Sequence, residues 1–97
     1  MTYYSHLNFG NKRFVTAAWQ HNDPPETEIK TISVAFAFCS PKDSFCKARG
    51  RAIAEGRLQK NSHTISIPAK TGVHDSIGNF IRESLEDKYK PHWLANA

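Results

Sequence analysis

Residues 29–39 alternate between two kinds of side chain with a period of two, which is the clearest pattern in the chain. One set of positions is large and apolar and comprises Ile32, Val34, Phe36 and Phe38. The other set is small and comprises Thr31, Ser33, Ala35, Ala37 and Cys39. Because successive side chains of a strand point to opposite faces, this pattern predicts a strand with one bulky face and one small face. Two covered faces would suit a central strand.

Shorter segments of strand-forming residues lie on either side of it. Residues 2–8 and 12–20 predict two strands, and Gly10 and Asn11 between them are typical of a turn. Residues 21–28 are polar and contain Pro24 and Pro25, so they predict a loop. Residues 62–68 predict a fourth strand.

A helix is predicted from Pro41 to about Leu58. Ser40 is suited to the N-cap, Pro41 to the first helical position, and Asp43 completes an arrangement like a capping box. Rotation by about 100° per residue places one broad apolar side toward the sheet. That side contains Phe45, Cys46, Ala48, Ala52, Ile53 and Gly56.

A second helix is predicted over residues 75–90, with Asp75 as its cap and Pro91 after its end. Its apolar stripe contains Ile77, Phe80, Ile81, Leu85 and Tyr89. A tail begins at about residue 91, and its Trp93 and Leu94 need a surface to contact. The order strand-strand-strand-helix-strand-helix predicts an α+β fold with a mostly antiparallel four-stranded sheet and two helices.

Composition favours one soluble globular domain spanning residues 1–97, with 39% hydrophobic and 23% charged residues. No apolar run approaches the roughly 18 residues that a membrane span needs, and the N-terminus does not resemble a signal peptide. We therefore expect a cytoplasmic protein with no membrane partner, whose two cysteines are thiols.

The net charge of +4 is localised. Residues 40–60 hold six basic and two acidic side chains, while the rest of the chain holds seven of each. The basic residues of this segment are Lys42, Lys47, Arg49, Arg51, Arg57 and Lys60. A concentration of positive charge on one helix indicates an anionic partner.

The predicted helix places these cations differently. Lys47 and Arg51 fall opposite the apolar side, Arg57 falls at its border, and Arg49 falls inside it. Arginines bind phosphate through planar, paired hydrogen bonds, and helix N-termini attract anions. Gly50 and Gly56 each cost a helix about 1 kcal/mol, which close approach of another backbone or a ligand would explain. The alternatives are a merely solvated face and a structural ion pair of Arg49 with Glu55 or an acid of the second helix.

Other chemistry is sparse. Asn79 and Arg82 of the second predicted helix could flank a base or a sugar, although such residues also form the wet side of a helix. The histidines and cysteines lack the spacing of a zinc site, and no catalytic set has a local signature. We therefore expect no enzyme activity, no metal and no cofactor.

Residues 33–58, SVAFAFCSPKDSFCKARGRAIAEGRL, resemble the first family of Thoeris anti-defence proteins. The resemblance covers about a quarter of the chain. It implies a phage-encoded, oligomeric protein that binds cyclic nucleotide defence signals, chiefly a cyclised ADP-ribose, without cleaving them. The positions that carry over are Lys47, Gly50, Arg51, Gly56 and Arg57.

Together these observations predict an immune evasion protein of the host cell's cytoplasm that sequesters a cyclised ADP-ribose or a cyclic oligonucleotide. The predicted ligand-binding residues are Lys47, Arg49, Gly50, Arg51, Gly56, Arg57, Asn79 and Arg82. Two alternatives use the same basic helix, residues 41–58. One is a nucleic-acid-binding protein, whose affinity would fall steeply with salt. The other is an inhibitor of the anti-CRISPR type that contacts an acidic protein surface.

Overall fold

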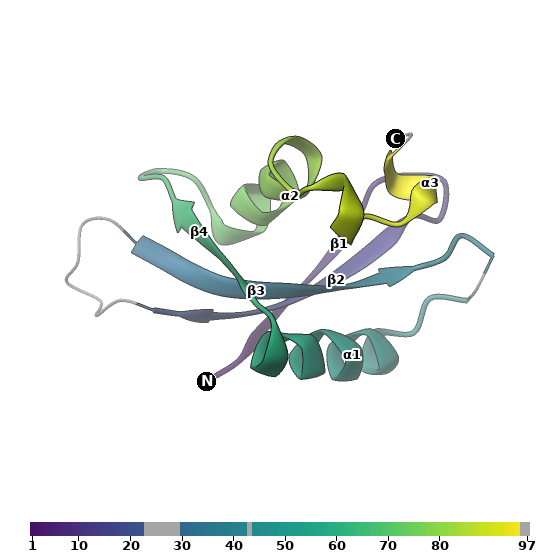
Figure 1. Cartoon of the computed structure of the whole chain (residues 1–97), viewed down its shortest axis with the longest axis horizontal. Helices are drawn as coiled ribbons and strands as arrows, with labels where there is room; N and C mark the ends of the chain where they lie inside the picture. Colours follow the sequence, from purple (N-terminus) through teal and green to yellow (C-terminus); the bar gives the residue numbers. More distant parts are fainter. Residues whose placement is uncertain (23–29, 43, 96–97) are drawn as a thin grey trace.

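Four antiparallel strands form one sheet in the order β1-β2-β3-β4 (Figure 1). The computed structural model describes residues 1–22, 30–42 and 44–95, so most of the predicted loop 21–28 and Asp43 lie outside the described residues. The strands are β1 (Tyr3–Asn8), β2 (Phe14–His21), β3 (Lys30–Cys39) and β4 (His63–Ile67). The predicted α+β fold is confirmed, because helix α1 (Lys47–Lys60) follows β3 and helix α2 (Val73–Glu83) follows β4.

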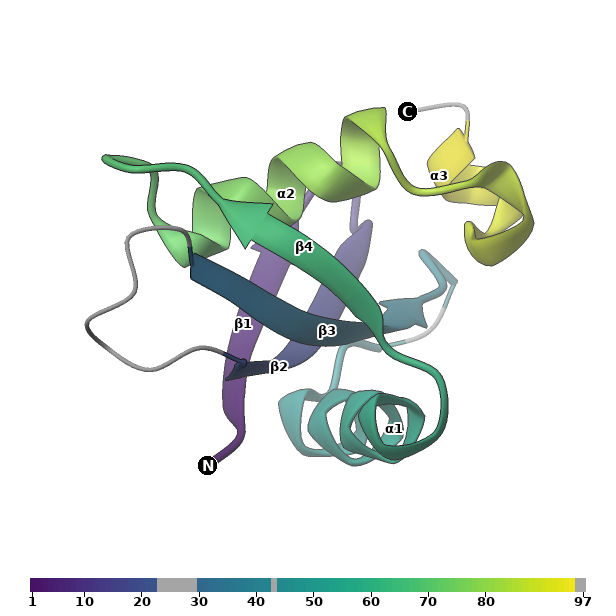
Figure 2. The same ribbon diagram turned by 60° about the vertical axis from the view of Figure 1, so that its left-hand side comes forward.

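The sheet is covered on both faces. Helix α1 lies against one face, whereas α2, the short helix η1 (Asp87–Tyr89) and α3 (His92–Ala95) lie on the other, as Figures 1 and 2 show. The turn between β1 and β2 is at residues 10–12, where Gly10, Asn11 and Lys12 all have positive φ. No helix in the described part of the chain has the length and apolar character needed to cross a bilayer.

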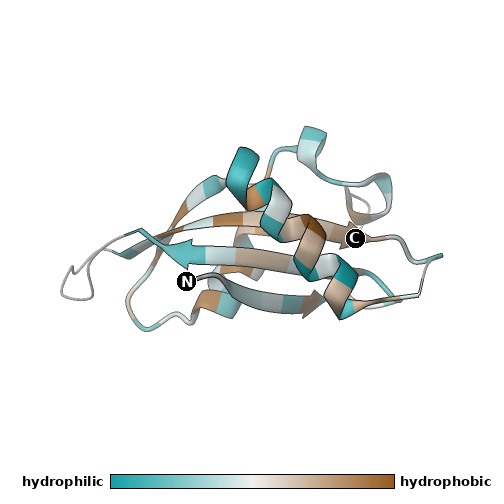
Figure 3. Ribbon diagram, turned by 90° about the horizontal axis from the view of Figure 1, so that it is seen from below, coloured by the Kyte–Doolittle hydropathy of each residue, from teal (hydrophilic) through white to brown (hydrophobic). Residues whose placement is uncertain are grey.

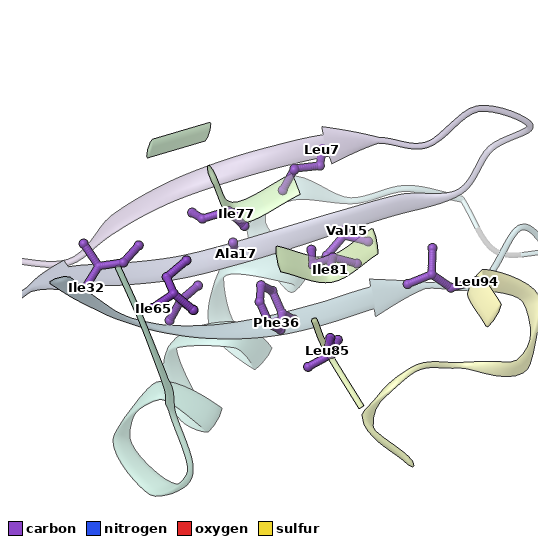
Figure 4. Close-up of a cluster of buried hydrophobic side chains, with 11 residues drawn as sticks. Leu7, Val15, Ala17, Ile32, Phe36, Ile65, Ile77, Ile81, Leu85 and Leu94 are labelled. Atoms are coloured by element: carbon purple, nitrogen blue, oxygen red, sulfur yellow. The ribbon is translucent and has the colours of Figure 1, made fainter. Parts of the chain in front are cut away.

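The bulky face of β3 contributes to the main core, as its alternation predicts. Ile32, Val34 and Phe36 are buried there under α2, whose Ile77 and Ile81 point down onto the sheet (Figure 4). The same cluster includes Leu94 of α3, and Trp93 approaches Phe38 edge-on with ring centroids 6.4 Å apart. The segment after residue 91 therefore closes one end of this core.

The small face of β3 receives α1 at close range. Ala35 and Ala37 of β3 and Ala18 of β2 form a buried surface against Ala54 and Leu58 of α1. Farther along the same helix, a Cβ added at Gly50 would lie 2.5 Å from Thr16 Oγ1. The predicted close neighbour of the small face is therefore α1, and Gly50 permits the approach.

Helix α1 begins later than predicted. Its N-cap is Cys46, with no side-chain cap, and Ser40 instead accepts a hydrogen bond from the backbone N–H of Lys42 at 3.3 Å. Residues 40–42 therefore belong to a loop. The local propensities of Ser40 and Pro41 suit a helix start, but the chain first has to travel from the end of β3 to the face that α1 covers.

The predicted orientation of α1 is also wrong. Ala48, Ala52 and Gly56 are exposed, and Ile53 is 39% exposed, although all were expected to face the sheet. The buried positions are Ala54 and Leu58, one helical turn apart. Hydrophilic and hydrophobic residues are mixed along α1, as Figure 3 shows, so the helix has no strong apolar stripe of its own. The side of α1 that is buried is the one whose side chains fit most closely against the alanine residues of the sheet.

Helix α2 is shorter than predicted. It begins after Gly72, so Asp75 lies in the first turn and is not the cap. It ends at Glu83, and the N–H of Leu85 bonds to the carbonyl of Phe80 at 2.8 Å as the chain leaves the helix. Tyr89 consequently belongs to η1 and is 40% exposed, outside the apolar stripe.

Candidate functional site

The basic side chains of the first turns of α1 are exposed to solvent or lie near strand β1. Lys47 and Arg49 are exposed, and Arg51 is half-buried. Among the described residues, the ion pairs are those of Lys88 and Lys90, and none involves these three side chains. Glu55 accepts a hydrogen bond from the Tyr4 hydroxyl at 3.0 Å. The alternative of a structural ion pair for Arg49 therefore finds no support in this part of the chain.

A small cavity lies at the N-terminal end of α1. Its lining includes Cys39, Phe45, Cys46, Arg49 and Gly50, and its volume is about 120 Å³. Both cysteines are thiols, as predicted. Pockets for small molecules are typically about 300–1,000 Å³, so this cavity is too small for a nucleotide.

A larger groove of about 530 Å³ lies at the other end of α1. Four segments form it: the end of α1 with Arg57, the start of β4 with His63, the middle of β3 with Phe36 and Phe38, and residues 88–90. The sheet and α1 supply two walls, and the segment after α2 supplies the third. Three cations and several aromatic rings are thereby brought together from distant parts of the sequence.

Hydrogen bonding and ring contacts order this groove. The Arg57 guanidinium donates through Nη1 to the backbone carbonyl of Phe36 at 2.8 Å, which anchors it at the edge of β3. The His63 ring stacks on Phe36 with centroids 5.7 Å apart and meets Tyr89 edge-on at 5.0 Å. Lys88 Nζ lies 5.1 Å from the Tyr89 ring centroid. The Tyr89 ring, which is 40% exposed, is thus a stacking surface beside the Lys88 ammonium, which also pairs with Glu86 at 3.3 Å.

Burial lowers the pKa of His63, whereas the carboxylate of Glu86 acts in the opposite direction. Burial also lowers the pKa of His6 in β1, and the positive charges of Lys47 and Arg51 lower it further. Both imidazoles therefore favour the neutral form in the folded state.

Acidification is expected to destabilise the fold through these two histidines. Their folded pKa lies below the ordinary value of 6.5, so the unfolded chain binds more protons below that pH. The stability they contribute is present above pH 6.5 and is lost as the pH falls through the folded pKa. Urea unfolding between pH 7.5 and 5 measures this slope. His6→Gln combined with His63→Gln should reduce it, and an unchanged slope in the double variant would contradict this assignment.

The eight residues predicted to bind ligand do not meet in one place. Arg57 lines the larger groove, and Arg49 and Gly50 line the small cavity. Asn79 and Arg82 lie on α2, across the sheet from α1, and line two further grooves. Lys47 and Arg51 lie near His6, and an added Cβ at Gly56 would meet nothing within 4 Å.

Sequence reasoning missed the partners of Arg57. The histidines have no spacing that singles out His63, and the periodicity predicts Tyr89 in the apolar stripe of a longer helix. The signal was the short run Lys88-Tyr89-Lys90, an aromatic residue between two cations just before a proline. Because α2 ends at Glu83, residues 88–90 are not helical in continuation of it and can lie beside Arg57.

In comparisons with known proteins, no protein-family model, curated protein or solved structure matches this chain. Within the described residues, no group of three or more histidine, cysteine or acidic side chains is placed to hold a metal ion.

Proposed function

We propose that the protein binds a cyclic nucleotide, either a cyclised ADP-ribose or a cyclic oligonucleotide, and sequesters it without cleavage. The observation that carries this proposal is the groove of about 530 Å³ in which Arg57, Lys88 and Lys90 meet the rings of His63 and Tyr89. Cationic side chains bind phosphates and aromatic rings stack on bases, and this groove contains both kinds of side chain. Such binding would make the protein a phage-encoded immune evasion factor in the cytoplasm of a bacterial host.

Each part of the ligand has a counterpart in the groove. The guanidinium of Arg57 is held by one hydrogen bond and keeps further donors for a phosphate. Lys88 and Lys90 add positive charge, and Tyr89 offers an exposed face for stacking a base. Sequestration requires affinity and exclusion of water but no general base or metal, which distinguishes this binder from an enzyme.

The proposal includes assembly of two or more copies. A groove open to solvent would leave part of a nucleotide in water, and a second copy would cover it. We assign this contact to the exposed surface of α1 that contains Gly56 and is bordered by the partly exposed Ile53. A contact between copies would also explain a glycine at position 56, where nothing in the described chain lies within 4 Å of an added Cβ.

Thermal melting against cyclised ADP-ribose isomers, cyclic dinucleotides and cyclic trinucleotides tests the proposal. One ligand should raise the melting temperature by several degrees and be recovered intact after the protein is heated. Light scattering of the same samples gives the number of copies. A short DNA duplex is the control: a shift with the duplex alone, lost at high salt, would favour a nucleic-acid-binding protein and contradict the proposal.

Two variants locate the ligand. Arg57→Ala should raise the dissociation constant by tenfold or more, because a hydrogen bond to a charged group is worth about 1.5–3 kcal/mol. Tyr89→Ala should have an effect of similar size through lost stacking, about 1–3 kcal/mol. Lys42→Ala is the matched control, since it removes an exposed cation from the loop before α1. Equal affinities in all three variants would remove this groove from the site.

A further inference from the structure

A second groove carries positive charge on the opposite side of the sheet from α1. It has a volume of about 370 Å³ and lies between the β1–β2 turn, the C-terminal half of α2 and the segment that leads into α3. Arg13, Arg82 and Lys90 line it, one from each of these segments, together with Asn8 and Phe9. No carboxylate of the described chain is among its lining residues.

Contacts hold the two guanidinium groups at the walls of this groove. Arg13 donates through Nε to the carbonyl of Gly10 and through Nη2 to that of Phe9, both at 2.9 Å, which leaves Nη1 as a donor for a ligand. The guanidinium of Arg82 lies over the Phe9 ring, 4.9 Å from its centroid. A Cβ added at Gly78 would lie 3.3 Å from Nη1 of the exposed Arg82, so glycine at this position leaves room for the guanidinium.

Lys90 lines both this groove and the groove beside Arg57. Its side chain is only 12% exposed, yet its nearest carboxylate in the described chain is Asp87 Oδ1 at 3.8 Å. The Asp87 side chain is itself 91% exposed, so water screens this pair. An anion in the groove would give the Lys90 ammonium a second partner in a less exposed place than Asp87.

We infer that this groove binds a phosphate group through Arg13, Arg82 and Lys90. Three cations from three directions suit a tetrahedral anion, whereas a planar carboxylate is satisfied by one guanidinium fork. The phosphate can be inorganic phosphate or part of a phosphomonoester. Lys90 is shared with the groove beside Arg57, whereas Arg13 and Arg82 line this groove alone, so tests at these two arginines separate the inference from the proposed function.

The test is a titration of the full chain with inorganic phosphate, adenosine 5′-monophosphate and sodium chloride at constant ionic strength, followed by amide and arginine Nε chemical shifts. Saturable shifts at Gly10, Gly78 and Arg82 are expected with phosphate and not with chloride. Tighter binding of the monophosphate than of phosphate would identify a phosphomonoester as the ligand, and equal binding would identify free phosphate.

Matched variants make the result decisive. Arg82→Gln should raise the dissociation constant for phosphate about tenfold or more, and Arg82→Lys should give an intermediate value because it keeps the charge and loses the fork. Lys60→Gln removes an exposed cation from α1 and should change nothing. The inference is overturned if chloride reproduces the shifts or if Arg82→Gln binds phosphate as the original protein does. It is also overturned if Tyr89→Ala abolishes the response, since the anion would then lie in the other groove.

Discussion

Ile77→Ala is expected to lower the free energy of unfolding by about 2–5 kcal/mol, the range typical of isoleucine to alanine changes in a core. The Ile77 side chain is fully buried, at 0% exposure, between α2 and the sheet (Figure 4). Its removal takes away apolar burial and leaves a cavity between α2 and the hydrogen-bonded sheet, whose backbone cannot easily move to fill it. Urea unfolding monitored by circular dichroism measures the change.

Ile53→Ala is the matched control, because it makes the same chemical change in the other helix. Ile53 is 39% exposed at the flank of α1, where it lines the small cavity, so its loss should cost only about 1 kcal/mol in a single copy. The comparison also tests the orientation of α1 directly. Equal losses for the two variants at a concentration where the protein is monomeric would contradict the orientation described above.

Gly50→Ala is expected to destabilise the protein by about 1–2 kcal/mol, although alanine is the better helix former. The helix would gain about 1 kcal/mol, but overpacking of this kind costs about 1–3 kcal/mol or more. An added Cβ would lie 2.5 Å from Thr16 Oγ1 and 3.0 Å from Thr16 Cβ. Thr16 is 1% exposed and its hydroxyl lies 3.0 Å from His6 Nδ1, so it cannot rotate away cheaply.

Gly56→Ala, six residues farther along the same helix, should have the opposite sign. Nothing within 4 Å would meet the new Cβ, so the monomer should gain about 1 kcal/mol from helix propensity. Thermal unfolding of both variants at low protein concentration measures the difference. Stabilisation by Gly50→Ala would show that α1 does not approach β2 as closely as described. If the protein is an oligomer, a higher dissociation constant between copies in Gly56→Ala would support the placement of Gly56 at the contact between them.

The strands were predictable because their pattern is strong and local. The alternation in β3 separates a bulky face from a small one, and both faces are used as the pattern indicates. The turn at Gly10 and Asn11 was predictable for a similar reason, since few residues adopt positive φ readily. The four-stranded sheet and the order of the helices follow from these signals.

The helix boundaries and the orientation of α1 were not predictable in the same way. Ser40, Pro41 and Asp43 form a good start signal, yet α1 begins at Lys47. Alanine and glycine occur all around α1, so hydrophobicity alone does not distinguish its buried side. The buried side is the one that fits the alanine surface of the sheet, and that fit involves residues far apart in the sequence.

The candidate groove depends on the tertiary structure even more strongly. Of the eight residues that sequence reasoning selected, only Arg57 lies there. His63 lies close to Arg57 in the sequence, at the start of β4, but Tyr89 reaches them only through the return of the chain after α2, which no local pattern encodes.

By itself, the sequence determined the four strands, the two faces of β3, the presence of two helices and the concentration of positive charge in residues 40–60. Each of these follows from the periodicity or chemistry of neighbouring residues. The tertiary structure decided where the helices begin and end, which side of α1 is buried, and which cations share a groove. Those features depend on contacts between segments that are distant in the sequence, and such contacts override weak local preferences when they bury more surface and fit more closely.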